Sequence, residues 1–378
     1  MSYLSEIKLQ NFRCYERAVL DGLSSGLMVL YGPNGAGKTN ILEAISLLSP
    51  GRGLRSAKNV DMQKNNQADS WGIFAECQTG AGFVKLGTGL DPEKEKRLIR
   101  INGVTAKSQN AFSDYLACVW LTPQMDRLFL EGAGTRRRFF DRLVFAFDPG
   151  HAGRVTRYEN AMRQRSKLLQ EGRLDPAWLK SLESQMAETG VAISAARLDF
   201  VQKLQEACQQ IDAEQSALFP KAGITLSGTI EVLLEKQPAL EVEALFAYQL
   251  EQSRNDDVRT GGAATGPHKS DMLVHYLDKN MPASHCSTGE QKALLITIII
   301  AHSRLMGAEK GLLPILLLDE VAAHLDEKRR AALFDILRSL GGQVWMTGAD
   351  ASLFDSIQGK AQFFHVESAE ILGTPIAA

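Results

Sequence analysis

The sequence predicts an α/β protein in which a mixed sheet with flanking helices is interrupted by a helical second lobe. Short apolar runs at 27–31 and 315–318 predict buried strands. From Leu179 to Ile211, apolar residues recur at steps of three, four or seven, which is typical of a long amphipathic helix. Sheet-forming segments at both ends of the chain therefore enclose a helical middle.

The 378 residues are enough for two or three domains. We expect a head formed by 1–130 plus 260–378, with 131–259 inserted as the helical lobe. Within this lobe, residues 150–171 favour helix and 172–176 break it before the long apolar stripe begins. Two helices joined by a short polar turn predict an antiparallel hairpin.

The overall charge limits how the chain can meet nucleic acid. Lys and Arg number 42 against 44 Asp and Glu, a formal net charge of −2, so contact with nucleic acid or an anionic membrane must come from local patches. Five scattered cysteines without a CxxC pair argue against a disulfide framework or a zinc site and suit a cytoplasmic protein. The most apolar run, 293–301, is too short to cross a membrane, which needs about 20 residues.

A glycine-rich segment between a predicted strand and a predicted helix fits G-x-x-x-x-G-K-[ST]. Its glycines let backbone N–H groups surround phosphate oxygens, and the helix that follows adds its N-terminal dipole. Lys38 is expected to contact the β- and γ-phosphates and the Thr39 hydroxyl to bind Mg²⁺. The expected nucleotide-binding residues are Gly32, Pro33, Asn34, Gly35, Ala36, Gly37, Lys38, Thr39 and Asn40.

Two acidic residues follow the apolar strand at 315–318 directly. Open α/β sheets bind ligands at the carboxyl ends of their strands, so we expect Asp319 to hold Mg²⁺ and Glu320 to orient or deprotonate the attacking water. Together with Lys38, these two residues are the expected catalytic set.

Thirty-two positions before Asp319, the segment Ser287-Thr288-Gly289-Glu290-Gln291 opens a predicted helix. Locally, Ser287 and Glu290 fit a capping box. The same segment resembles the signature motif of the ATP-binding-cassette (ABC) ATPase class, whose serine and glycine contact nucleotide held by the other subunit. Both interpretations stay open at this point.

Six short motifs, in family order, resemble the RecF family, bacterial recombination and gap-repair proteins of the ABC/SMC-like ATPase class. They are Asn11-Phe12-Arg13, Gly32–Thr39 followed by Ser49–Gly53, Arg136–Asp141, Gly266–Lys269, Ser287–Gln291, and Asp319-Glu320 followed by Ala323–Asp326. The resemblance implies an ABC-type head split by a helical lobe, ATP with Mg²⁺, ATP-dependent homodimerisation, slow hydrolysis and DNA binding. It also implies work with RecR and RecO in loading RecA at single-strand gaps.

The resemblance assigns further residues. Gln124 occupies the Q-loop position and is a candidate metal ligand, Asp326 lies in the D-loop, and Ser287 with Gly289 acts in trans. A transporter subunit would carry its switch histidine where this chain has Thr347-Gly348, so fast turnover is not expected.

Two cationic clusters are candidates for contact with duplex, gapped or single-stranded DNA. One is the run Arg136, Arg137 and Arg138, and the other comprises Arg52, Arg55 and Lys58. Arginine pairs well with phosphate, although either cluster could instead be a solvated or salt-bridged face. No helix-turn-helix or zinc module predicts base-specific recognition.

We therefore expect an ATP-gated DNA-binding dimer of replication and recombinational repair, because the chain has one complete head and a signature that acts in trans. One alternative is the energising subunit of a membrane transporter. The position of the signature motif late in the chain and the lack of a switch histidine at Thr347-Gly348 argue against it. The other is an SMC-type chromosome protein. The short predicted helical hairpin and the absence of a CxxC pair argue against it.

Overall fold

The computed structural model describes residues 2–64, 70–172, 175–210, 219–323 and 325–372. Contacts divide the chain into two compact units that are each built from segments distant in the sequence. The first comprises Met1–Asp126, Asp212–Phe219 and Leu295–Ala378, and the second comprises Arg127–Ile211 and Pro220–Leu294. The domain boundaries at 130 and 260 stay a prediction, because clusters of contacts do not by themselves define independently folding domains.

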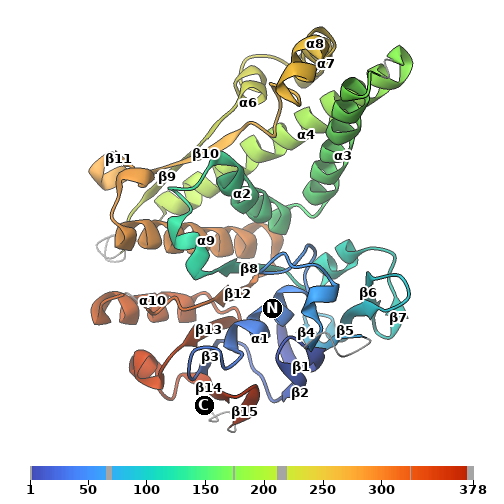
Figure 1. Cartoon of the computed structure of the whole chain (residues 1–378). Helices are drawn as coiled ribbons and strands as arrows, with labels where there is room; N and C mark the ends of the chain where they lie inside the picture. Colours follow the sequence, from blue (N-terminus) through green and yellow to red (C-terminus); the bar gives the residue numbers. More distant parts are fainter. Residues whose placement is uncertain (1, 65–69, 173–174, 211–218, 324, 373–378) are drawn as a thin grey trace. The chain divides into compact units, whose positions relative to one another are not determined.

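The first unit contains a six-stranded, mostly parallel sheet in the order β15-β14-β3-β13-β12-β8 (Figure 1). Its strands are β3 (Leu27–Tyr31), β8 (Cys118–Leu121), β12 (Ile315–Leu318), β13 (Val344–Gly348), β14 (Ala361–Glu367) and β15 (Glu370–Leu372). Only β15 pairs antiparallel to its neighbour. The predictions of buried strands at 27–31 and 315–318 are confirmed.

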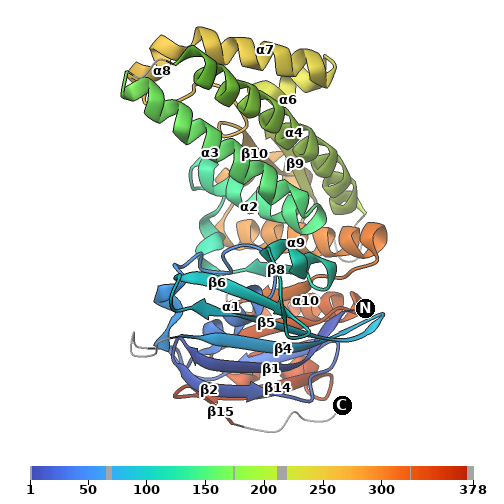
Figure 2. The same ribbon diagram turned by 90° about the vertical axis from the view of Figure 1, so that its right-hand side faces the viewer.

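A second six-stranded sheet in this unit is antiparallel throughout, in the order β2-β1-β4-β5-β6-β7 (Figures 1 and 2). Its strands are β1 (Tyr3–Phe12), β2 (Tyr15–Leu20), β4 (Gly72–Thr79), β5 (Gly82–Asp91), β6 (Lys96–Ile101) and β7 (Val104–Thr105). Alternating burial along β1 and β4 shows that one face of this sheet packs on the core.

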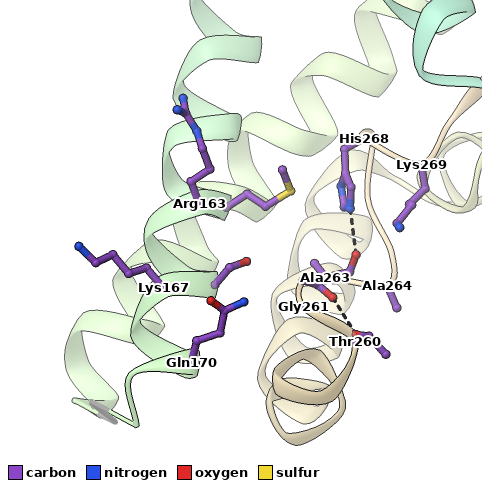
Figure 3. Close-up of a pocket in the computed structure, with 12 residues that line it drawn as sticks. Arg163, Lys167, Gln170, Thr260, Gly261, Ala263, Ala264, His268 and Lys269 are labelled. Atoms are coloured by element: carbon purple, nitrogen blue, oxygen red, sulfur yellow. Dashed lines mark hydrogen bonds between the residues drawn. The ribbon is translucent and has the colours of Figure 1, made fainter.

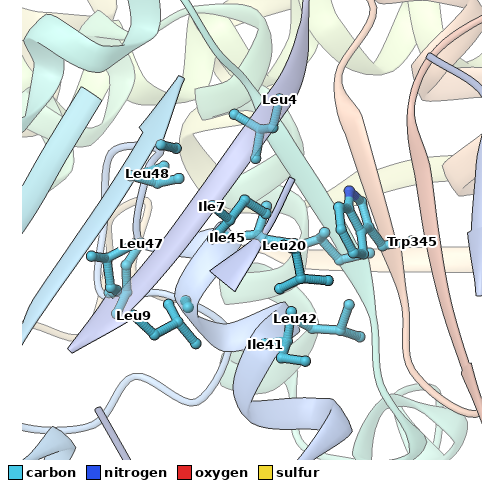
Figure 4. Packing of buried hydrophobic residues seen from close by; sticks show 14 of the residues in the cluster. Leu4, Ile7, Leu9, Leu20, Ile41, Leu42, Ile45, Leu47, Leu48 and Trp345 are labelled. Carbon is cyan, nitrogen blue, oxygen red and sulfur yellow. The ribbon is translucent and has the colours of Figure 1, made fainter. Parts of the chain in front are cut away.

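The core of the first unit joins β1, the helix α1 (Lys38–Ser46) and the parallel sheet (Figure 4). Leu4 and Ile7 of β1, Ile41 and Ile45 of α1, and Trp345 of β13 are all fully buried. Burying a Leu or Ile side chain stabilises the fold by about 1.5–3 kcal/mol. This packing holds α1, which begins directly after the loop that follows β3, against the parallel sheet.

The remaining helices of the first unit are α10 (Glu327–Ser339) and most of α9 (Thr288–Lys310), whose first residues belong to the second unit. Short 3₁₀ turns lie at Val60–Met62, Gln109–Asp114, Pro123–Arg127, Leu277–Lys279, Ala283–His285 and Ala351–Ile357.

The second unit is mainly helical. Its helices are α2 (Ala133–Phe147), α3 (Gly150–Gln170), α4 (Pro176–Gln209), α6 (Thr229–Leu234), α7 (Ala239–Gln252) and α8 (Arg254–Thr260). A three-stranded antiparallel sheet accompanies them, with β9 (Ala222–Ser227), β10 (Asp271–Tyr276) and β11 (Met281–Pro282).

The long helix predicted from the apolar stripe is α4, which has 34 residues and packs beside α3 (Figures 1 and 2). Asp175 caps its first turn by accepting hydrogen bonds from two backbone N–H groups. Leu179 and Met186 of α4 pack with Tyr158 of α3 in the core of this unit. Ile211, the last residue of the predicted stripe, lies outside the described residues.

A buried ion network ties three helices of the second unit together. The Arg165 guanidinium on α3 lies 2.9 Å from Glu183 of α4 and 2.7 Å from Asp257 of α8. Arg254 adds a second cation to Glu183 at 2.5 Å. Since each of the three central side chains is at most 3% exposed, every charge in the cluster depends on its partners.

Candidate functional site

The predicted strand, glycine loop and helix are all present, as β3, residues 32–37 and α1. A side chain could not replace Gly32 because its Cβ would lie 2.1 Å from the Val366 carbonyl oxygen. At Gly37, where φ is +115°, a Cβ would lie 2.5 Å from the Tyr15 hydroxyl. No side chain caps the N-terminus of α1, so its first N–H groups are available to an anion.

Lys38 is the first residue of α1, and its side chain, only 6% exposed, folds back against this loop. Its ammonium donates to the carbonyl oxygens of Gly32 at 2.6 Å and Pro33 at 2.8 Å. Burial lowers the pKa of Lys38, and the carboxylates of Glu320 and Asp319 counteract part of that effect. The cation is therefore held at the loop by neutral acceptors that a phosphate oxygen could replace.

Thr39 and Asp319 are 280 positions apart in the chain, yet their side chains touch. The Thr39 hydroxyl lies 3.0 and 3.1 Å from the two Asp319 carboxylate oxygens. The contact forms because β3 and β12 are parallel strands of one sheet, so the segments that follow them leave at the same edge.

A hydroxyl and a carboxylate are the oxygen donors that Mg²⁺ takes in nucleotide sites, usually with water and phosphate oxygens as its other ligands. Across the residues that the structure describes, no group of three or more His, Cys, Asp or Glu could by itself hold a metal ion. The Thr39 and Asp319 pair therefore fits a cation shared with a phosphate better than a metal bound by protein alone.

Thr347, which the sequence placed at the position of a transporter's switch histidine, has contacts that the sequence did not reveal. It is fully buried at the end of β13. Its hydroxyl donates to Asp319 Oδ1 at 2.7 Å and accepts the Glu320 backbone N–H at 2.8 Å. Glu320 itself has a φ of +51°, a left-handed conformation that is uncommon for a glutamate. One hydroxyl thus fixes both acidic residues.

The signal for Thr347 was present but weak. Met346 pairs with Leu318 in the parallel register of β13 and β12, so the next residue on each strand is Thr347 and Asp319. A threonine near the end of a buried strand was visible in the sequence, but the contact follows only from the register of β12 and β13.

Gln124 is exposed in the 3₁₀ turn after β8. The Asp319 N–H at the end of the neighbouring strand donates to the Leu121 carbonyl oxygen at 2.9 Å, which places Gln124 three residues beyond the anchored end of β8. Within the described part of the chain the Gln124 side chain makes no hydrogen bond, and its role as a metal ligand stays a prediction.

The segment Ser287–Gln291 belongs to the second unit, and α9 begins within it at Thr288. The capping box is present: the Ser287 hydroxyl and N–H both lie 2.8 Å from Glu290 Oε2, and the Glu290 N–H is 3.4 Å from the hydroxyl. Lys279 forms an ion pair with Glu290, and its hydrogen bond, with those from Ser287, lowers the pKa of Glu290 to about 2.

The first residues of the same segment are accessible to solvent. Ser287 and Thr288 are exposed, and nothing lies within 4 Å of the position a Cβ would take at Gly289. Gln291 is buried and donates to the Cys286 carbonyl oxygen at 2.9 Å, so it anchors the start of α9. The capping hydrogen bonds and the exposure of Ser287 therefore coexist, and the role of this segment in trans stays a prediction.

Asp326 is the N-cap of α10. Its carboxylate accepts the Arg329 N–H at 2.8 Å, and its side chain is 61% exposed. Position 324 of the expected D-loop lies outside the described residues.

The arginine run on α2 is divided between internal and exposed positions. Arg136 forms a bidentate pair with Asp271 of β10 at 2.8 and 2.7 Å. Arg137 donates to the Ser270 carbonyl oxygen at 2.7 Å, and burial lowers its pKa. Arg138 is exposed. Arg136 is therefore salt-bridged within the protein, which was the alternative to a DNA contact, and Arg137 is hydrogen-bonded to the protein backbone.

The second cluster is similarly divided. Arg55 lies 2.9 Å from Glu43 of α1, which also pairs with Arg13 at 2.6 Å. Arg52 and Lys58 are exposed and form no ion pair within the ranges that the structure describes. Of the six candidate cations for DNA, Arg138, Arg52 and Lys58 remain open to a ligand.

The phosphate loop, the Thr39–Asp319 contact and the paired sheets of the first unit define the head of an ABC-type ATPase. The family described as RecF/RecN/SMC N terminal domain matches residues 3–371. A "DNA replication and repair protein RecF" from Mesorhizobium japonicum is 48% identical over 368 residues, which cover 97% of this chain and 96% of that protein. The chain belongs to the RecF family.

Solved structures agree on the fold. One described as the recombination mediator protein RecF-ATP in the RecFOR pathway has a TM-score of 0.85 at 22% identity, covering 100% of this chain and 98% of that one. An Smc head domain from Pyrococcus furiosus has a TM-score of 0.56 at 15% identity, covering 100% and 97%. The ABC/SMC-like head expected from the sequence is confirmed. Among the described helices, none is long and apolar enough to cross a membrane.

Proposed function

We propose that this chain is an ATP-dependent DNA-binding protein of replication and recombinational repair. Its curated relatives are named DNA replication and repair protein RecF, and the family assignment favours this function over a transporter subunit. The observation that carries the nucleotide part is the contact of Thr39 with Asp319 beside the Lys38 loop. In this proposal, the loop that would bind phosphate and the pair that would bind the cation lie at one edge of the sheet.

ATP is the proposed ligand of the loop. The Lys38 ammonium would move from the Gly32 and Pro33 carbonyls to the β- and γ-phosphates, while N–H groups at the start of α1 bind the phosphate oxygens. Thr39 and Asp319 would hold Mg²⁺, with Gln124 as a further candidate ligand. When bound, Mg²⁺ neutralises part of the phosphate charge.

Glu320 is the proposed residue that orients the attacking water. Thr347 is its positioning residue, because the Thr347 hydroxyl fixes the Glu320 backbone and the Asp319 carboxylate together. A threonine here supplies no imidazole to the γ-phosphate. We therefore infer a weak, DNA-stimulated ATPase whose hydrolysis resets the protein.

The second half of each nucleotide site would come from another copy of the chain. At the start of α9, Ser287 is exposed, and nothing lies within 4 Å of the position that a Cβ would take at Gly289. A segment that contacts nucleotide in trans must be accessible in this way. ATP would thus favour a homodimer by binding the closed state more tightly than the open one. Closure would align cationic surfaces along duplex or gapped DNA, and the dimer would work with RecR and RecO to load RecA in the cytoplasm.

The experiment is sedimentation of the full chain with ATP and Mg²⁺, with and without duplex DNA. We expect the wild type to dimerise with ATP, Lys38→Ala to stay monomeric, and Glu320→Gln to persist as an ATP-bound dimer. An unchanged dimerisation constant in Lys38→Ala would overturn the assignment of the loop. Normal hydrolysis by Glu320→Gln would show that another residue positions the water.

A further inference from the structure

The second unit contains a cavity of about 720 Å³ between α3 and the glycine-rich loop that follows α8 (Figure 3). Neither side of it belongs to the nucleotide site. Arg163, Ser166 and Lys167 line it from α3, and Gly262, Ala263 and Lys269 line it from the loop. We call this cavity the α3–loop groove.

The groove is cationic on both sides. Its lining residues include Arg163 and Lys167 of α3 and Lys269 of the loop, and none of them is a carboxylate. All three cationic side chains are exposed. Lys167 has only a loose contact with Glu171, at 3.7 Å, and Lys269 forms no ion pair within the residues that the structure describes. Arg163 donates to two neutral acceptors on its own helix, the Glu159 carbonyl oxygen at 3.2 Å and Asn160 Oδ1 at 2.6 Å. Among the residues that the structure describes, Glu171 is thus the one carboxylate that pairs with these three cations.

The loop side of the groove is held in a fixed shape by His268. Its Nε2 donates to the Ala263 carbonyl oxygen at 2.9 Å, so its Nδ1 accepts the Tyr158 hydroxyl at 2.7 Å. Burial lowers the pKa of His268, which agrees with a neutral ring in this arrangement. At Gly266, where φ is +133°, a Cβ would lie 2.3 Å from the Tyr158 hydroxyl oxygen, so the close approach of loop and helix requires glycine.

The loop also offers backbone donors. The N–H groups of Gly262, Ala263 and Ala264 donate no hydrogen bond to any part of the chain that the structure describes, although Ala263 is only 3% exposed. The Ser166 hydroxyl lies on the facing helix, 3.7 Å from where a Cβ of Gly262 would be. The lining thus combines exposed cationic side chains with N–H and O–H donors, and both kinds of group can bind the oxygens of a phosphodiester.

We propose that the α3–loop groove binds the phosphodiester backbone of DNA. This inference rests on the proposed function and deepens it, since it places a DNA contact outside the two cationic clusters noted in the sequence. The contacts are to phosphate alone, so the binding is independent of base sequence and weakens as salt rises.

The test compares two double variants of the full chain with ATP present. Arg163→Gln with Lys167→Gln removes two charges from the groove. Arg157→Gln with Lys180→Gln removes two exposed charges that do not line it. Affinity for a labelled DNA duplex is measured at several salt concentrations. We expect only the groove pair to weaken binding, with a slope of log affinity against log salt that is shallower by about 0.9 for each phosphate that the groove no longer neutralises.

Three results would overturn the inference. One is a groove pair whose affinity and slope equal those of the wild type, and another is an equal loss of affinity in the control pair. In both cases wild-type binding to DNA leaves the proposed function standing. The third is a wild type that binds no DNA at any salt concentration, which removes the proposed function and the inference together.

A second measurement separates DNA from other anions. In Ser166→Cys, the rate of alkylation at position 166 is followed by mass spectrometry with duplex DNA, inorganic phosphate or polyglutamate. We expect DNA to protect the thiol. Protection by phosphate or polyglutamate without protection by DNA would assign the groove to a free anion or an acidic peptide and overturn the proposal.

Discussion

The Thr347 hydroxyl donates a 2.7 Å hydrogen bond to Asp319 Oδ1. It also accepts the Glu320 N–H at 2.8 Å, so the residue after Asp319 is fixed by the same oxygen. Three side chains, from three parallel strands or the segments after them, thus meet at one edge of the sheet: Thr39, Asp319 and Thr347.

Replacing Thr347 by Val should slow ATP hydrolysis. The change keeps the shape of the side chain but leaves Asp319 without this donor and the Glu320 N–H without its acceptor. A hydrogen bond to a charged group contributes about 1.5–3 kcal/mol, which corresponds to roughly a ten- to hundredfold loss in kcat. Steady-state kinetics over a range of Mg²⁺ concentrations measures it.

Thr347→Ser is the matched control, because it restores the hydroxyl. We expect it to recover most of the lost rate and the wild-type Mg²⁺ dependence. Equal activity in Thr347→Val and the wild type would remove the positioning role.

Replacing Arg165 by Met should destabilise the second unit. The substitution leaves Asp257 and part of Glu183 buried without their main cation, and breaking such a buried pair costs about 3–5 kcal/mol. Urea denaturation followed by circular dichroism measures the loss. Arg163→Met, on the exposed face of the same helix, should change the midpoint little, and an equal effect of both variants would contradict the account.

Stability of the second unit should also fall in acid through Asp141. Burial alone would raise the pKa of Asp141, but the Arg197 guanidinium and the His151 hydrogen bond lower it to about 2. A carboxyl whose pKa is lower in the folded chain stabilises the fold above its unfolded pKa of about 3.9 and loses that contribution as the pH falls toward 2.

The expected contribution of Asp141 is about 2 kcal/mol at neutral pH. Asp141→Asn should therefore be less stable than the wild type at pH 7, and the difference should shrink between about pH 4 and pH 2. A difference that is constant over this range would show that the carboxylate charge is not the cause.

The sequence predicted those parts of the site whose residues lie close together along the chain. The phosphate loop is a contiguous motif, and the buried strand before Asp319 is marked by four aliphatic residues. The capping box of Ser287 and Glu290 was likewise visible from their spacing.

The parts that it missed depend on residues far apart in the chain. Thr347 reaches Asp319 only through the register of β12 and β13. In the sequence, Arg136 was a candidate for contact with DNA phosphate. In the structure it pairs with Asp271, which lies 135 positions away in the chain. Charge runs do not reveal such partners, because an ion pair is set by tertiary packing.

The central claim is that each nucleotide site is shared between two copies of the chain, and mixing two inactive variants tests it most directly. Lys38→Ala lacks a working loop, and Ser287→Arg lacks a working signature. Sedimentation with ATP should show each variant alone as a monomer. Mixed together they should associate, because one site of the heterodimer joins the intact Lys38 of one chain to the intact Ser287 of the other. A mixture that stays monomeric while the wild type dimerises would contradict the shared site.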